Sequence, residues 1–240
     1  MLAALCTIVF VFERPRQMRY SRVMFIGHFA LGFAAKRATP RVSLVALFAA
    51  AQLADILWPF FLLAGWEQVR PAPGNNPFLL LDFVSYPLSH SLLMLVIWGV
   101  ALGFIYQKAT GAASSAFIVL AALVVSHWVL DVATHRPDMP LYPGGPKFGL
   151  GLWNYPTATL LIEGAMFVVG LSVYLRATRA RDRVGRWATW TLVALLVIAY
   201  GASLAGGAPP PENAIALGAI AGAAVIIAIS GWADRHRQPA

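Results

Sequence analysis

The chain has very little cysteine and few charges. Cys6 is its single cysteine, which excludes an internal disulfide and any CxxC metal knuckle. Only 12% of the 240 residues are charged, against roughly a quarter in ordinary soluble domains. Ten residues are Asp or Glu, so each acid that lies in an apolar segment needs an explanation. Thiol redox chemistry and an ordinary soluble domain are therefore not expected.

Hydrophobic residues take the place of the missing charge. They make up 59% of the chain, and the mean hydropathy is +0.69. Apolar runs of roughly 18 to 23 residues recur, each long enough to cross a hydrocarbon layer of about 30 Å. The sequence predicts an all-α, polytopic membrane helix bundle of about six transmembrane helices. The predicted spans are Val42–Ala64, Tyr86–Tyr106, Ala113–Thr134, Thr157–Leu175, Trp187–Leu204 and Ala214–Trp232.

The rest of the chain divides simply around these spans. Phe25–Ala35 is too short to cross the membrane and is predicted to be a re-entrant or interfacial helix. Residues 24–232 then form one transmembrane domain, and 233–240 form a cytoplasmic tail. Residues 1–23 form an N-terminal arm that need not belong to the native product, because Met18 or Met24 could be the start. A poorly ordered arm explains the same residues equally well.

The basic residues predict the orientation of the bundle. The net charge is +8, but Lys and Arg stand in short clusters between apolar spans, which is typical of topology signals and not of a nucleic-acid-binding face. The Arg-rich stretch 176–186 is placed in the cytoplasm. Alternation then puts both termini in the cytoplasm and the loops 65–85 and 135–156 on the outer face. A multi-pass protein of the inner, or plasma, membrane is predicted, with no nucleic-acid partner.

Several ionisable residues lie within or beside the predicted spans. Such a side chain in a bilayer costs about 3 kcal/mol or more unless it is paired, protonated or bound to a cation. His127, Asp131 and His135 stand at i, i+4 and i+8, so they share one helix face if the helix continues. Two ligands one turn apart can bind one ion, but Asp131 could also simply hold a histidine in place. Asp55 lies four residues before Pro59, which predicts a kinked pocket around it.

Acids and imidazoles from different spans are predicted to meet at similar depth. Imidazole nitrogen and carboxylate oxygen are ligands of zinc and other divalent metals, and the lack of cysteine favours a catalytic site over a closed thiolate site. A carboxylate that does not bind the ion, Glu163 or Asp131, would act as a general base. The predicted metal ligands are His28, Asp55, His90, His127, Asp131 and His135.

The residues also resemble a known family, the membrane-bound metal-dependent hydrolases of the YdjM type. The resemblance covers roughly Met24 to Glu163 and implies a bound divalent metal, most simply zinc, and hydrolytic activity. It is carried by an early histidine, an aspartate near the end of an apolar segment, a His-Ser pair that opens the next helix, and a Ser-His-x-x-x-Asp helix. The matching stretches are Gly27-His28, Ala54-Asp55, Ser89-His90-Ser91 and Ser126-His127 to Asp131.

These observations predict a membrane-embedded, metal-dependent hydrolase that acts at the outer face on a lipid or another membrane-associated ester or phosphoester. An ion- or proton-coupled transporter that uses the intramembrane acids and histidines is the alternative. Haem binding between His90 and His127, or buried hydrogen bonds that only join helices, are further readings. Trp58, Trp66, Trp128 and Trp153 are predicted to belong to an interfacial aromatic belt. The oligomeric state is left open.

Overall fold

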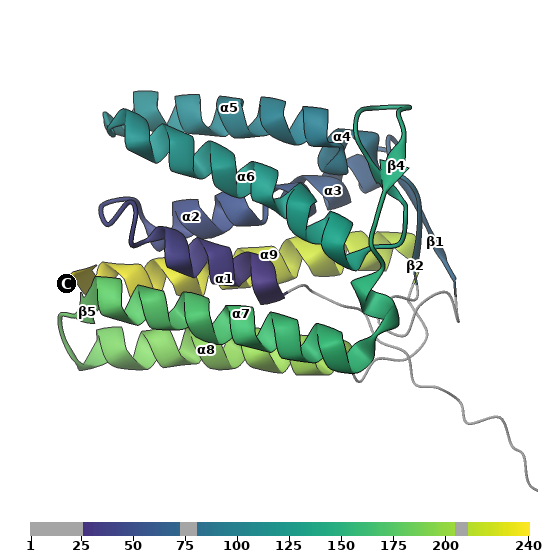
Figure 1. The fold of residues 1–240 in the computed structure, drawn as a ribbon. Coiled ribbons are helices and arrows are strands. Elements are labelled where there is room, and N and C mark those ends of the chain that lie inside the picture. Colours follow the sequence, from purple (N-terminus) through teal and green to yellow (C-terminus); the bar gives the residue numbers. More distant parts are fainter. Residues whose placement is uncertain (1–25, 73–80, 205–210) are drawn as a thin grey trace, which may run out of the picture.

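The computed structural model describes residues 26–72, 81–204 and 211–240, so the predicted arm 1–23 lies outside the described residues. The described chain is an all-α membrane helix bundle whose long helices run side by side (Figure 1). Its α-helices are α1 (Ile26–Ala35), α2 (Leu44–Ala51), α3 (Leu53–Leu63), α4 (Pro87–His90), α5 (Leu92–Thr110), α6 (Ser114–Thr134), α7 (Pro156–Ala177), α8 (Arg183–Leu204) and α9 (Glu212–Arg235). A 3₁₀ turn, η1 (Leu152–Asn154), precedes α7.

The predicted number of spans is confirmed. Within the described residues, five helices are long and apolar enough to cross a membrane, namely α5 to α9, and the bent pair α2 and α3 makes a sixth if it is counted as one span. The short helix α1 lies inside the bundle, where it packs against α2, α6 and α7. Most of its residues are buried, so it is not an interfacial helix with one face toward the headgroups.

Short strands occupy the segments predicted to be plain loops. Three antiparallel pairs form, β1 (Gln68–Pro71) with β2 (Leu81–Ser85), β3 (Met139–Pro140) with β4 (Lys147–Phe148), and β5 (Thr178–Ala180) with β6 (Arg237–Pro239). The first two pairs lie with α4 at one end of the bundle, and β5 lies at the opposite end (Figure 1). We call these the hairpin end and the basic end.

Two helix boundaries differ from the sequence prediction. Helix α3 continues through Pro59, and the 59° bend of this segment lies at Gln52, between α2 and α3. The span predicted to begin at Tyr86 is two helices. Pro87 does open a helix, but α4 ends at His90 and the extended residue Ser91 caps α5. The Ser91 hydroxyl donates to the Pro87 carbonyl, which stabilises this break.

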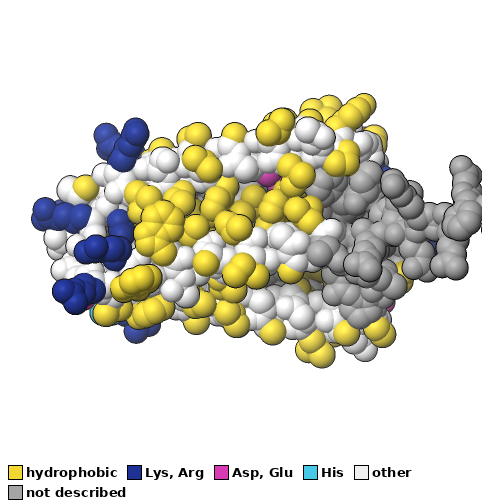
Figure 2. Space-filling view, turned by 90° about the horizontal axis from the view of Figure 1, so that it is seen from below, with side chains coloured by type: hydrophobic (Ala, Val, Ile, Leu, Met, Phe, Trp, Pro, Cys, Tyr) yellow, Lys and Arg dark blue, Asp and Glu magenta, His cyan; other side chains and the backbone are white. Residues whose placement is uncertain are grey.

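Charge is distributed unevenly along the bundle. Lys and Arg side chains gather at one end, whereas hydrophobic side chains cover the flank (Figure 2). Large apolar side chains such as Ile105, Ile118, Leu161 and Ile198 are more than 60% exposed, as expected for a surface that faces lipid. The gathering of basic residues supports the loop grouping used in the topology prediction. The side of the membrane that each terminus faces stays a prediction.

Small residues let neighbouring helices approach closely. A Cβ atom on Gly170 of α7 would overlap the backbone of Ala30 in α1, so only glycine fits there. Gly99 of α5 also lies close to α6, and a Cβ atom there would stand 3.0 Å from the carbonyl oxygen of Ala121. Lipid tails are as apolar as the helix surfaces, so close van der Waals contact of this kind is a main source of helix association in membranes. The contact between α1 and α7 fixes the position of the short helix that carries His28.

The predicted tail 233–240 is part of the folded bundle. Helix α9 continues to Arg235, and residues 237–239 pair with β5. Lys36, just after α1, is 5% exposed, and its Nζ donates to the Val42 carbonyl and to Asp234 Oδ1, each at 2.7 Å. This buried ion pair joins α1 to α9 at the basic end.

The tryptophans do not all follow the belt prediction. Trp66 is 64% exposed at the hairpin end, as an interfacial residue would be. Trp58 and Trp153 are only 7% and 4% exposed, because they pack in a cluster with Tyr86 and Met139. These two indoles therefore belong to the packed interior and not to an interfacial belt.

Candidate metal centre

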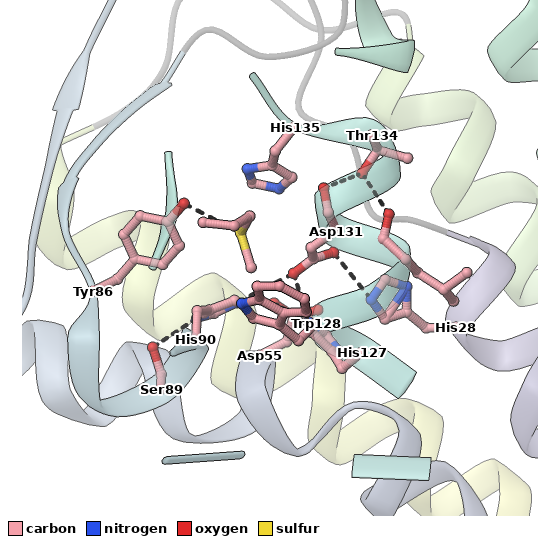
Figure 3. Close-up of polar contacts among 12 residues, drawn as sticks. His28, Asp55, Tyr86, Ser89, His90, His127, Trp128, Asp131, Thr134 and His135 are labelled. Carbon is pink, nitrogen blue, oxygen red and sulfur yellow. Dashed lines mark hydrogen bonds and ion pairs between the residues drawn. The ribbon is translucent and has the colours of Figure 1, made fainter. Parts of the chain in front are cut away.

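Helix α6 and helix α1 supply the most buried part of the site. His127 and Asp131 stand one turn apart on α6, with 3.2 Å between His127 Nε2 and Asp131 Oδ2. His28 of α1 approaches the other oxygen, and its Nε2 lies 3.2 Å from Asp131 Oδ1. All three side chains are at most 5% exposed. Figure 3 shows the Asp131 carboxylate among the imidazoles.

The helices α3 and α4 supply the second part. His90 is the last residue of α4, and its Nε2 lies 3.4 Å from Asp55 Oδ1 and 4.0 Å from Asp131 Oδ2. Asp55 Oδ1 also lies 3.8 Å from His127 Nε2. The Asp55 side chain is 47% exposed, whereas those of His90, His127 and Asp131 are at most 6% exposed. Asp55 is therefore the accessible member of the set.

The donor atoms are close enough to share an ion. They form two overlapping groups within 4.8 Å, His28 with His127 and Asp131, and Asp55 with His90 and His127. Two ligand atoms that each lie about 2 Å from one ion are at most about 4 Å apart, and each of the four closest nitrogen–oxygen pairs meets that limit. Imidazole nitrogen with carboxylate oxygen suits zinc and similar divalent ions. The residues present fit such an ion.

The backbone fixes the orientation of His127. Its Nδ1 lies 2.9 Å from the carbonyl oxygen of Ala51, the last residue of α2. A carbonyl only accepts, so Nδ1 carries the proton and donates it. The lone pair of the neutral ring then lies on Nε2, which faces Asp131 and Asp55. A ring held this way is typical of a histidine metal ligand.

A buried glutamate orients His90 through a serine. The Ser89 hydroxyl donates to Glu67 Oε2 at 2.6 Å, so it accepts from His90 Nδ1, also at 2.6 Å. Glu67 Oε1 accepts the backbone N–H groups of Leu88 and Ser89 at the start of α4. Glu67 is 1% exposed although it lies in the turn after α3. The sequence analysis missed Glu67, because the unsatisfied N–H groups of a helix start signal the need for an acceptor but not which residue supplies it.

Replacement of Glu67 by Gln is expected to weaken divalent metal binding about 10- to 100-fold, the usual effect of losing the partner that orients a ligand. The amide that replaces the carboxylate no longer has to accept the Ser89 proton, so the Ser89 hydroxyl can donate to His90 Nδ1 instead. The ring proton of His90 then moves to Nε2, the nitrogen that would bind the metal. Metal titration of chelator-treated protein measures this effect. Glu212→Gln, at an exposed position of α9, is the control. An affinity for Glu67→Gln within twofold of the wild type would contradict the assignment.

His135 lies outside both donor groups, although the sequence analysis predicted it as a ligand. Helix α6 ends at Thr134, and His135 has an extended backbone, so it no longer follows the helical spacing of His127 and Asp131. Its Nδ1 lies 3.0 Å from Asp138 Oδ1, and its ring packs against Trp153. Burial alone would lower the pKa of His135, but the hydrogen bond with Asp138 and the negative charges of nearby carboxylates together outweigh burial and raise that pKa.

Asp138 is the centre of a second polar network at the hairpin end. The Tyr86 hydroxyl donates to Asp138 Oδ1 at 2.9 Å, and Arg136 Nε donates to Oδ2 at 3.1 Å. Arg136 also pairs with Asp82 of β2. Burial would raise the pKa of Asp138, but its hydrogen bonds, that with His135 first, lower it. Burial and the neighbouring carboxylate raise the pKa of Tyr86. The network ties the end of α6 to β2 and α4 and so supports the site.

Glu163, the predicted general base, also lies outside both groups. Its side chain is fully buried on α7, where Trp153 Nε1 lies 3.5 Å from Oε1. Tyr200 of α8 is a further neighbour of this carboxyl group. The structure thus brings together His28, Asp55, His90, His127 and Asp131, and not His135 or Glu163. The functional roles of all these residues stay predictions.

Comparison with known proteins fits this arrangement. The model of the YdjM inner membrane protein family matches residues 23–208, which include all five clustered donors. The chain belongs to the YdjM inner membrane protein family. No curated protein and no solved structure gives a significant match. The YdjM family is one of inner membrane proteins, and the long apolar helices of this member fit a membrane location.

Proposed function

We propose that this YdjM family member is a membrane-embedded, metal-dependent hydrolase that acts on a membrane lipid ester or phosphoester. The observation that carries the proposal is the meeting of three imidazoles and two carboxylates from α1, α3, α4 and α6 inside an apolar bundle. Polar side chains that only hold helices together need one hydrogen-bond partner each. Here every Nε2 in the set faces a carboxylate oxygen, and two of the rings have a proton fixed on the opposite nitrogen.

A bound divalent ion would supply Lewis-acid polarisation of the substrate oxygen and a lower pKa for a water molecule beside it. His28, His127 and Asp131 would hold the ion, and the buried Asp131 would compensate its charge. His90 completes the ligand set from the side of Asp55. Glu67 and Ala51 keep the two rings in the orientation that binding needs.

Asp55 is the residue placed to move a proton. Its carboxylate is the exposed one in the set, so a substrate and a water molecule can reach it. In hydrolysis the water oxygen bonds to the acyl carbon or phosphorus, and the bond to the leaving oxygen breaks. Asp55 accepts the proton released by the water and returns it to the leaving oxygen. The proposal gives this role to Asp55 because Glu163 lies outside both donor groups.

Elemental analysis of detergent-purified protein tests the proposal. We expect a stoichiometric divalent metal in the wild type and a loss of most of it in His127→Ala, because both donor groups contain His127. His236→Ala, in an exposed pair with Asp182 at the basic end, is the control and should keep its metal. Wild-type protein without metal, or a His127→Ala variant that keeps it, would contradict the proposal. Iron with a haem spectrum, or metal-independent ion flux that requires Asp131, would favour the alternatives.

A further inference from the structure

A groove opens on the bundle flank beside the metal centre. It has a volume of about 420 Å³ and is lined mainly by residues of α3 and α9, with others from α1, α2, α8 and β2, among them Phe29 and Phe48. Among the described residues, Asp55 is the one charged residue that lines the groove, so the groove and the donor set share this carboxylate. Figure 2 shows a hollowed hydrophobic flank with an acidic side chain visible among apolar ones.

Helix α9 forms a long, smooth wall of the groove. The lining residues of α9 extend from Ile215 to Ile227, about 18 Å along a helix that rises 1.5 Å per residue. Gly218 and Gly222 lie in this wall, are exposed, and have no atom within 4 Å of a Cβ built on them. The wall therefore leaves open, apolar space that runs along the bundle for more than half of a hydrocarbon layer of about 30 Å.

Two polar atoms in the groove have no hydrogen-bond partner within the part of the chain that the structure describes. Gln52 Oε1 and Trp58 Nε1 both lack a hydrogen bond, although each residue is only 7% exposed and lines the groove. Gln52, Asp55 and Trp58 follow one another at three-residue steps, which puts them on one side of α3. Buried polar groups in proteins almost always have a partner. Gln52 Oε1 is a hydrogen-bond acceptor and Trp58 Nε1 is a donor, and Asp55 lies between them. A ligand that satisfies both atoms must therefore carry one donor and one acceptor.

The molecule that occupies the groove has to combine one hydrogen-bond donor and one acceptor with a long apolar part. The groove opens toward the lipid-facing flank, where hydrocarbon chains surround the protein. A helix of a second copy could fill the space beside Gly218 and Gly222, but its backbone groups are bonded internally and would leave Gln52 and Trp58 unmatched. A single hydrocarbon chain fits an elongated groove along one helix. A free hydroxyl and an ester carbonyl at the end of that chain would match the acceptor and the donor.

We propose that the groove binds a monoacyl glycerolipid. The acyl chain lies along α9, the ester carbonyl accepts from Trp58 Nε1, and a glycerol hydroxyl donates to Gln52 Oε1. This arrangement puts the lipid linkage beside Asp55. Binding itself requires no metal, and only the statement that this lipid is the substrate rests on the proposed function.

Photolabelling of the purified, chelator-treated protein tests the site without turnover. The probe is a monoacylglycerol with a diazirine in its acyl chain. Gly222→Phe, which fills the groove without a backbone clash, is expected to lower labelling at least tenfold. Gly201→Phe is the matched control, because Gly201 of α8 is exposed, has an equally open Cβ position and does not line the groove. Trp58→Phe, which removes the donor and keeps most of the ring, is expected to lower labelling several-fold.

Competition separates the hydrogen-bonding pattern from simple partitioning. Unlabelled monoacylglycerol should displace the probe at least tenfold more effectively than the fatty-acid methyl ester, which has the carbonyl but no hydroxyl. Labelling unchanged in Gly222→Phe, equally reduced in Gly201→Phe, or replaced by a cross-linked dimer of the chain would overturn the proposal. Because labelling uses metal-free protein, failure here leaves the elemental analysis untouched. A protein without metal that still shows the expected labelling would instead contradict only the hydrolase.

Discussion

Asp131→Asn is expected to reduce the divalent metal content to background and to abolish hydrolysis. Asp131 is the buried carboxylate of the donor set, and its two oxygens face His28 on one side and His127 and His90 on the other. Asparagine keeps the shape but removes the negative charge that would offset a divalent ion in a medium where charge is poorly solvated. Elemental analysis gives the metal content. Thermal unfolding with and without a chelator gives a second readout, because metal that binds only the folded state raises its stability.

The expected pattern separates metal binding from general destabilisation. Chelation should lower the unfolding temperature of the wild type and leave that of Asp131→Asn unchanged. Asp182→Asn, at an exposed position of the basic end, should behave like the wild type. If Asp131→Asn retains metal and still responds to the chelator, the metal centre as described is wrong.

Asp234→Ala is expected to lower the free energy of unfolding by about 3–5 kcal/mol, the usual cost of leaving a buried charge without its partner. The side chain of Lys36 is 6% exposed, and its ammonium has only Asp234 as an ionic partner among the described residues. The loss would loosen the contact between α1 and α9 far from the metal centre. Unfolding in detergent by denaturant titration measures the change.

A double variant distinguishes the ion pair from simple packing. Lys36→Met with Asp234→Ala removes both charges, so it should be clearly more stable than Asp234→Ala alone. Arg235→Ala removes an exposed side chain one residue away and should change stability little. A double variant as unstable as Asp234→Ala would show that the effect comes from lost packing.

Much of the candidate site could be predicted from local sequence. The pairing of His127 with Asp131 follows from helical periodicity, because residues four apart lie on one face of a helix. The same rule gave a wrong expectation for the position of His135, since periodicity ends where the helix ends and one extended residue turns the ring toward Asp138. Glu163 was predicted from depth alone, and depth does not tell which side of a helix meets which neighbour.

The sequence by itself determined the membrane class, the number of spans and the identity of the donors, because hydropathy, span length and residue chemistry are local properties. The tertiary structure decided which donors meet. The close approach of α1 to α7 and α6 brings His28 to Asp131, and the turn after α3 brings Glu67 under Ser89. The bend at Gln52 and the small residues of α9 open the groove beside Asp55. These contacts join segments far apart in the chain, so they depend on how the helices cross and not on any pattern within one helix.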